Sequence, residues 1–135
     1  MYPQEIVIPM KEELTENGFE DLVTPEQVEA ELKKEGTTLF VINSVCGCSA
    51  GTARPGVLLA LESSQKKPNH LATSFAGFDF EAVQKVREHL LPYPPSSPSV
   101  ALFKKSCLNE IFQSVKRLGY LLGCHVNKCK FSVDT

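Results

Sequence analysis

The sequence predicts an α/β domain, in which helices cover a sheet that contains at least two parallel strands. Three observations lead to this prediction. Helical and strand-like segments alternate through the middle of the chain. The length of 135 residues suits one domain. The hydrophobic fraction of 42% is ordinary for a globular protein and is enough to build a buried core. We therefore expect residues 1–135 to form a single domain.

Two helices are expected in the first third of the chain. Residues 5–17 carry apolar side chains at helical spacing. Residues 24–35 contain the clearest helix start, because Thr24 suits the N-cap and Gln27 stands three residues later, where it completes a capping box.

Three strands and two further helices follow. Residues 38–45 form a short apolar run that is rich in β-branched side chains, which predicts a strand buried on both faces. Residues 71–76 and 100–103 predict two more strands. Residues 50–64 and 80–91 predict the helices that follow the first two strands.

Two residues fix details of these later helices. Pro55 either kinks the helix over residues 50–64 or marks its real start. Asp79 is expected to cap the helix over residues 80–91.

The last thirty residues predict a different ending. Five apolar side chains fit an amphipathic helix near residues 108–118, docked on the sheet. No good strand is evident beside residues 100–103, so we expect an incomplete sheet edge and a loosely ordered end after Gly123. The amphipathic side chains are Leu108, Ile111, Phe112, Val115 and Leu118.

Charge and hydropathy exclude several classes of function. The formal net charge is −2, so no excess positive field attracts a phosphate backbone, and generic nucleic-acid binding is not expected. The longest apolar stretches fall far short of the ~20 residues of a membrane helix. The N-terminal residues do not resemble a signal peptide, so we expect a cytoplasmic protein.

The cysteines point to metal or redox chemistry. The chain has five, and an odd number without an export signal argues against a disulfide framework. They are Cys46, Cys48, Cys107, Cys124 and Cys129.

Cys46 and Cys48 stand between the predicted buried strand and the following helix. The positive end of a helix dipole favours a thiolate over a thiol, so this position suits a reactive cysteine. The one-residue spacing requires a bend, which Gly47 permits. A disulfide in so small a ring is expected to be strained and easily reduced, which suits an exchange catalyst better than a structural crosslink.

A proline-rich loop supplies a second element of such a site. Pro98 directly precedes the strand expected over residues 100–103. Thioredoxin-like sites place a cis-proline opposite the cysteines, just before a later strand. We therefore expect a cis Ser97–Pro98 bond that leaves backbone groups available to a substrate segment.

Several linked motifs resemble those of the bacilliredoxins. The segment Asn43–Gly51, followed by Ala53–Pro55, is similar to their active-site region, and Phe75–Gly77, Pro95–Ser99 and Val7–Leu14 also match. The resemblance covers about residues 4–104, and residues 106–135 depart from it.

This resemblance implies a thioredoxin-like fold and thiol–disulfide exchange. Bacilliredoxins remove bacillithiol from protein mixed disulfides, and disulfide isomerase activity is also associated with them. Carried over, Cys46 is the attacking thiol and Cys48 the resolving thiol. The implied partners are S-thiolated or disulfide-bonded client proteins and a low-molecular-weight thiol, which acts as the reductant. No metal or tightly bound cofactor is expected.

One alternative from another class is a non-catalytic zinc-binding or protein-interaction module. Cys46, Cys48, Cys124 and Cys129, with His125 nearby, offer enough ligands for a closed zinc site. The two halves have unlike spacings, which favours the redox interpretation.

Other residues near the cysteines also have two interpretations. Arg54 either binds an anionic thiol substrate or lies on a solvated helix face. Asn43 and Ser44 either polarise the site or merely end the strand. Gly47 and Pro98 are expected to contact substrate. His70 and His89 are expected at the surface.

Overall fold

The computed structural model describes residues 2–47, 49–64, 67–91, 97–104 and 107–112. Helices and strands alternate through most of this part of the chain, and the last two elements are adjacent strands. In chain order the elements are α1 (Gln4–Thr15), β1 (Glu20–Asp21), α2 (Pro25–Leu32), β2 (Thr37–Asn43), the π-helical turn η1 (Ser49–Ala53), α3 (Arg54–Ser63), β3 (His70–Phe75), α4 (Phe80–Leu90), β4 (Ser99–Lys104) and β5 (Cys107–Phe112).

The strands form one mixed sheet in the order β1-β3-β2-β4-β5. β3 runs parallel to β2 and β4 runs antiparallel to it. Asn43, at the end of β2, lies opposite Phe75, and Ile42 lies opposite Ser99. The loop after β2, the loop after β3 and the loop before β4 therefore meet at one edge of the sheet, which we call the reactive edge.

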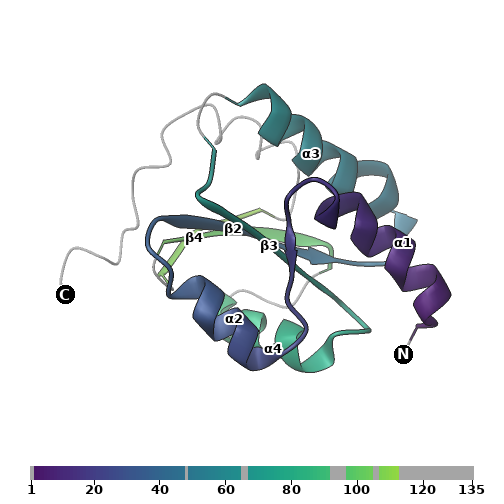
Figure 1. Ribbon diagram of the computed structural model, residues 1–135, viewed down its shortest axis with the longest axis horizontal. Helices are drawn as coiled ribbons and strands as arrows, with labels where there is room; N and C mark the ends of the chain where they lie inside the picture. The colour runs from purple at the N-terminus through teal and green to yellow at the C-terminus, as the bar shows by residue number, and fades with distance from the viewer. Residues whose placement is uncertain (1, 48, 65–66, 92–96, 105–106, 113–135) are drawn as a thin grey trace.

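Helices cover both faces of the sheet, with α1 and α3 on one side and α2 and α4 on the other (Figure 1). The central strand β2 is buried on both faces, as predicted. Phe40 and Ile42 pack with α2 and α4, whereas Leu39 and Val41 pack with α1 and α3. This arrangement confirms the predicted α/β class and is thioredoxin-like.

Local signals at two helix starts are confirmed. Thr24 Oγ1 accepts a hydrogen bond from the N–H of Gln27 at 3.2 Å, and Gln27 Oε1 accepts one from the N–H of Thr24 at 3.1 Å. Pro55 stands in the first turn of α3 and marks its start, directly after η1. A proline fits there because the first helical N–H groups need no intrahelical partner.

Asp79 occupies the N-cap position of α4, but its side chain does not cap the helix. The prediction of a side-chain cap is wrong because the carboxylate has other partners. Its Oδ2 accepts a hydrogen bond from the N–H of Phe75 at 2.9 Å and pairs with Lys11 Nζ at 2.8 Å. Lys11 also pairs with Asp21 at 3.0 Å. Asp79 thus fastens α1 to the β3–α4 turn.

The prediction of a helix near residues 108–118 is wrong for the part that the structure describes, because residues 107–112 form the strand β5. β5 pairs antiparallel with β4, from Lys104 opposite Cys107 to Val100 opposite Phe112, with a register shift between Leu102 and Phe103. The edge of β4 is therefore covered, and the expected incomplete edge is also wrong. The apolar spacing of so short a segment fits a strand as well as a helix. Hydrogen bonding with the backbone of β4, which would otherwise be unpaired, favours the strand.

Two further expectations concern the ends of the chain. Residues 113–118 and the end after Gly123 lie outside the described residues.

The two-residue strand β1 has no counterpart in the sequence prediction, because so short a strand leaves no alternating pattern. Among the described residues, no helix is both long and apolar enough to cross a membrane.

Candidate active site

The first predicted cysteine lies where β2 turns into a helix at the reactive edge. Cys46 is half-buried, and its carbonyl accepts hydrogen bonds from the N–H groups of Ser49 at 3.0 Å and Ala50 at 3.3 Å. Cys46 therefore immediately precedes a helical turn, as the sequence predicted. Gly47 is exposed, with no heavy atom within 4 Å of the position that a Cβ would take. Cys48 lies outside the described residues.

The side chain of Asn43 organises the loop beneath Cys46. Its Oδ1 accepts hydrogen bonds from the N–H of Ser44 at 2.8 Å, from Ser49 Oγ at 2.9 Å and from Arg54 Nη1 at 2.9 Å. Its Nδ2 donates to the carbonyl of Met10 in α1 at 3.1 Å. Asn43 therefore does more than end the strand, because it joins β2, η1, α3 and α1 at one buried point.

Ser44 lies between Asn43 and Cys46 in the sequence and hydrogen-bonds to the cysteine loop. Its Oγ accepts a hydrogen bond from the N–H of Cys46 at 3.0 Å, and its carbonyl accepts one from Arg54 Nη1 at 3.0 Å. These bonds fix the backbone on the N-terminal side of Cys46. The main chain that carries the thiol is therefore held from β2 and from α3.

Arg54 is buried, with 1% of its surface exposed. Its Nη1 donates to Asn43, to Ser44 and, at 3.1 Å, to Ser49 Oγ, while its Nε forms an ion pair with Glu13 of α1. The interpretation as a residue on a solvated helix face is wrong. Direct contact with a substrate stays a prediction, and the buried contacts favour a positioning role beneath the cysteine loop.

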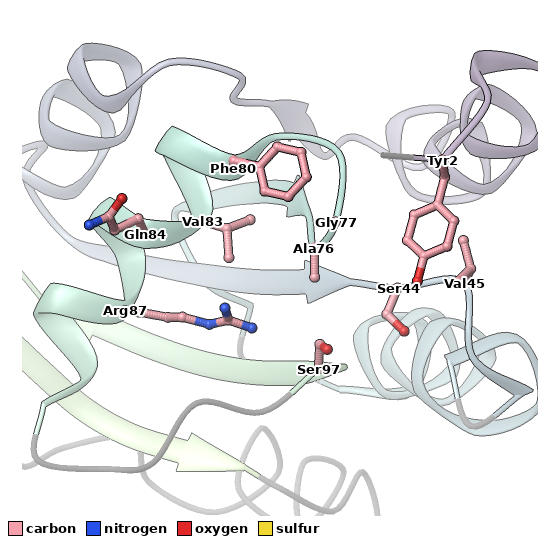
Figure 2. A pocket seen from close by; sticks show the side chains of 10 residues that line it. All are labelled: Tyr2, Ser44, Val45, Ala76, Gly77, Phe80, Val83, Gln84, Arg87 and Ser97. Atoms are coloured by element: carbon pink, nitrogen blue, oxygen red, sulfur yellow. The ribbon is translucent and has the colours of Figure 1, made fainter.

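The proline loop reaches the same edge. The Ser97–Pro98 bond is cis, as expected. Ser97 lines a pocket of about 460 Å³ together with Ser44 and Val45 of the cysteine loop (Figure 2). The pocket thus joins the segments that precede Cys46 and Pro98. Contacts of Gly47 and Pro98 with a substrate stay predictions.

The remaining wall of this pocket comes from the β3–α4 turn, from α4 and from the N-terminus. Gly77 has a φ of +81°, and a Cβ there would lie 2.5 Å from the ring of Tyr2. This close approach explains why glycine follows β3 in the motif Phe75–Gly77. The other lining residues are Ala76, Phe80, Val83, Gln84 and Arg87.

The two histidines are partly exposed, and neither is among the residues that line the pocket. His70 Nε2 contacts the carbonyl of Glu35 at 3.0 Å. His89 Nε2 contacts Glu29 at 3.0 Å, and its ring packs edge-on against Phe103 with centroids 6.3 Å apart. The hydrogen bond with His89 holds the pKa of Glu29 below its ordinary value. Both histidines therefore link segments that are distant in the sequence.

The zinc alternative finds no support in the described part of the chain, where no three His, Cys, Asp or Glu side chains are grouped to hold a metal ion. Three of the proposed ligand cysteines, Cys48, Cys124 and Cys129, lie outside that part. Cys107 belongs to β5.

Comparison with known proteins decides the family. The family model described as "Disulphide isomerase" matches residues 2–118. A bacilliredoxin of Cytophaga hutchinsonii is 64% identical over 104 residues, which cover 77% of this chain and 76% of that protein. The chain belongs to the bacilliredoxin family. A bacilliredoxin of Halalkalibacterium halodurans is 58% identical and one of Geobacillus kaustophilus 54% identical, each over 76% of this chain and 72% of the relative.

Family membership gives the site a thiol–disulfide redox role. The geometry is compatible with this match, because Cys46 precedes a helical turn and Val45 and Ser97 line the same pocket. The family model reaches residue 118 and so includes β5.

Proposed function

We propose that this protein reduces mixed disulfides between client proteins and a low-molecular-weight thiol of the bacillithiol type. The Cys46 thiolate attacks the sulfur of the small thiol, the mixed disulfide breaks, and the client leaves as a thiolate that takes a proton from water. Cys48 then attacks the Cys46 sulfur, releases the bound thiol and leaves a Cys46–Cys48 disulfide, which two molecules of free small thiol reduce. Alternatively, a second small thiol attacks the Cys46 sulfur directly and leaves as the disulfide of the small thiol. The two electrons come from the thiol reductant, so the reaction needs no metal and no tightly bound cofactor.

The observation that carries the proposal is the placement of Cys46. Its carbonyl receives the first N–H groups of a helical turn, and its own N–H is held by Ser44. A helix start favours the thiolate, which is the attacking species. Such chemistry needs a reducing compartment, so we propose a cytoplasmic location and thiolated proteins, rather than nucleic acids or membranes, as partners.

The test uses one client protein that carries a single mixed disulfide with the small thiol. We expect Cys46→Ser to abolish release of the small thiol. We expect Cys48→Ser to attack once and to retain the small thiol on Cys46, because it lacks the resolving sulfur. Mass spectrometry of the intact protein detects this adduct, and Cys129→Ser serves as the control that removes a thiol with no assigned role.

The same experiment can reverse the roles assigned to Cys46 and Cys48. If Cys46→Ser accumulates the small thiol on Cys48, then Cys48 is the attacking residue. If both single variants retain full turnover, neither cysteine carries the reaction and the proposal is wrong.

A second activity, disulfide isomerisation, is favoured by the description of the matching family model. A refolding assay with a client that contains scrambled disulfides tests it, with Cys46→Ser as the inactive control. The same purified protein tests the zinc-module alternative. Stoichiometric zinc after purification without added metal would favour that alternative over the redox proposal.

A further inference from the structure

The pocket at the reactive edge has one charged residue in its lining, Arg87 (Figure 2). The polar atoms of Ser44, Gln84 and Ser97 share the lining with apolar walls that include Phe80. A cavity with a single cation and no carboxylate among its described lining residues has a positive local field. Such a cavity favours an anionic ligand.

Among the residues that the structure describes, Arg87 has no carboxylate partner, unlike its neighbours on α4. Lys85 lies 3.4 Å from Glu29 and 3.2 Å from Glu88, and His89 contacts Glu29 at 3.0 Å. By contrast, Arg87 Nε is buried and has no hydrogen-bond partner within the described residues. Buried polar groups are nearly always hydrogen-bonded, so this nitrogen leaves a donor available to a ligand in the pocket.

The position of the pocket relative to the thiol suggests which ligand this is. Val45, which directly precedes Cys46, lies in the pocket wall, and Ser97, which directly precedes the cis-proline, also contributes. A small molecule whose sulfur reacts with Cys46 would therefore have its remaining atoms beside this pocket. A carboxylate on that molecule matches the planar fork of an arginine.

We propose that the pocket binds the carboxylate-bearing part of the small thiol in the mixed disulfide, with Arg87 pairing with the carboxylate. This inference rests on the proposed function and assigns a binding residue, Arg87, for a carboxylate of its small-thiol substrate. Binding there orients the sulfur of the small thiol, rather than the sulfur of the client, toward Cys46. The new bond joins Cys46 to the small thiol, the old disulfide breaks, and the client leaves as a thiolate.

The test compares two mixed disulfides on the same cysteine of the same client protein. One adduct carries mercaptosuccinate, which has two carboxylates, and the other carries thioglycerol, which has none. For Arg87→Gln we expect kcat/KM to fall roughly 10- to 100-fold on the mercaptosuccinate adduct, mainly through a higher KM, because a charge-assisted pair is lost. On the thioglycerol adduct we expect no significant change.

Two further variants separate binding from structure. Arg87→Lys keeps the charge and should retain part of the preference for the mercaptosuccinate adduct. Lys104→Gln removes the same charge at the far end of β4, where Lys104 lies opposite Thr37, and should leave both adducts unaffected. Raised salt should weaken the preference of the wild-type protein for mercaptosuccinate, because it screens the pair.

The outcomes distinguish this inference from the proposed function. Equal losses on both adducts in Arg87→Gln would show a structural role, and no loss on either would show that the pocket does not select carboxylates. Either result overturns the inference while the proposed function stands. If the wild-type protein reduces neither adduct, the proposed function fails and the inference fails with it.

Discussion

Truncation of the buried arginine beneath the cysteine loop, Arg54→Ala, should strongly destabilise the protein. Its Nη1 lies 2.9–3.1 Å from three buried acceptors, but the atom has only two hydrogens, so the contacts count as about two hydrogen bonds. Hydrogen bonds to charged groups contribute about 1.5–3 kcal/mol each. The pair with Glu13, whose side chain is 49% exposed, adds less than about 1 kcal/mol.

The expected loss is therefore about 3–6 kcal/mol, which corresponds to two such hydrogen bonds, and the half-exposed pair with Glu13 adds little. That is a large share of a total stability of about 5–15 kcal/mol. Urea unfolding under reducing conditions measures the loss as a lower midpoint with an unchanged slope. Arg54→Lys should show an intermediate loss, because one ammonium cannot reach both the loop and Glu13.

Exposed Lys104 provides the control, since Lys104→Ala should change the free energy of unfolding by no more than about 0.5 kcal/mol. Exchange activity should also fall in Arg54→Ala at temperatures where the variant is folded, because Ser44 and Ser49 on either side of Cys46 lose an anchor. A loss of stability below about 1 kcal/mol, the contribution of one ordinary hydrogen bond, would refute this account of the site.

Three other predictions concern the surroundings of the site. Gly77→Ala should cost about 1–2 kcal/mol in urea unfolding, because φ is +81°, and adding Tyr2→Ala should recover only the part due to the ring contact; full recovery would contradict backbone strain. Glu29→Gln should lower stability by less than about 1 kcal/mol near neutral pH. That difference should shrink as pH falls below the ordinary carboxyl pKa and vanish below the lowered pKa of Glu29; a difference that does not change with pH would contradict the ionic origin of the effect. Truncation after Gly123 should leave exchange activity nearly intact, whereas truncation before β5 should expose the edge of β4 and promote aggregation, measured by light scattering; loss of activity in the longer form would give the tail a function.

The elements with strong local signals could be predicted from the sequence. The capping box at Thr24 and the buried strand ahead of Cys46 rest on interactions within a few residues, or on burial over a whole segment. The resemblance to bacilliredoxin motifs predicted both the cysteine loop and the proline loop of the site. These features needed no knowledge of which segments meet in space.

The support beneath the cysteines could not be predicted in the same way. Arg54 finds Glu13 across 41 residues of sequence, and Asn43 finds Met10 across 33. Both contacts depend on how α1 lies against α3 and β2. A polar residue after a strand and an arginine at a helix start look ordinary until the fold brings them together.

Two further residues show other limits of local patterns. In the sequence, Arg87 looks like any other residue on the polar face of α4. Only the structure shows that its Nε is buried and has no hydrogen-bond partner among the described residues, whereas Lys85 pairs with Glu29. The segment over β5 has apolar residues at positions that suit a helix, and only the unpaired edge of β4 decides in favour of a strand. Both features depend on segments that are distant in the sequence, namely the residues that complete the pocket around Arg87 and the strand β4 beside β5.

The contact between Tyr2 and Gly77 has a practical consequence for anyone who purifies this protein. The aromatic ring of Tyr2 is part of the pocket wall, so residues fused to the N-terminus start close to this pocket (Figure 2). An affinity tag at the N-terminus would therefore start at the wall of the pocket that we propose for the small thiol. Kinetic comparisons of small thiols therefore require a cleavable N-terminal tag, removed without leaving bulky residues before Met1.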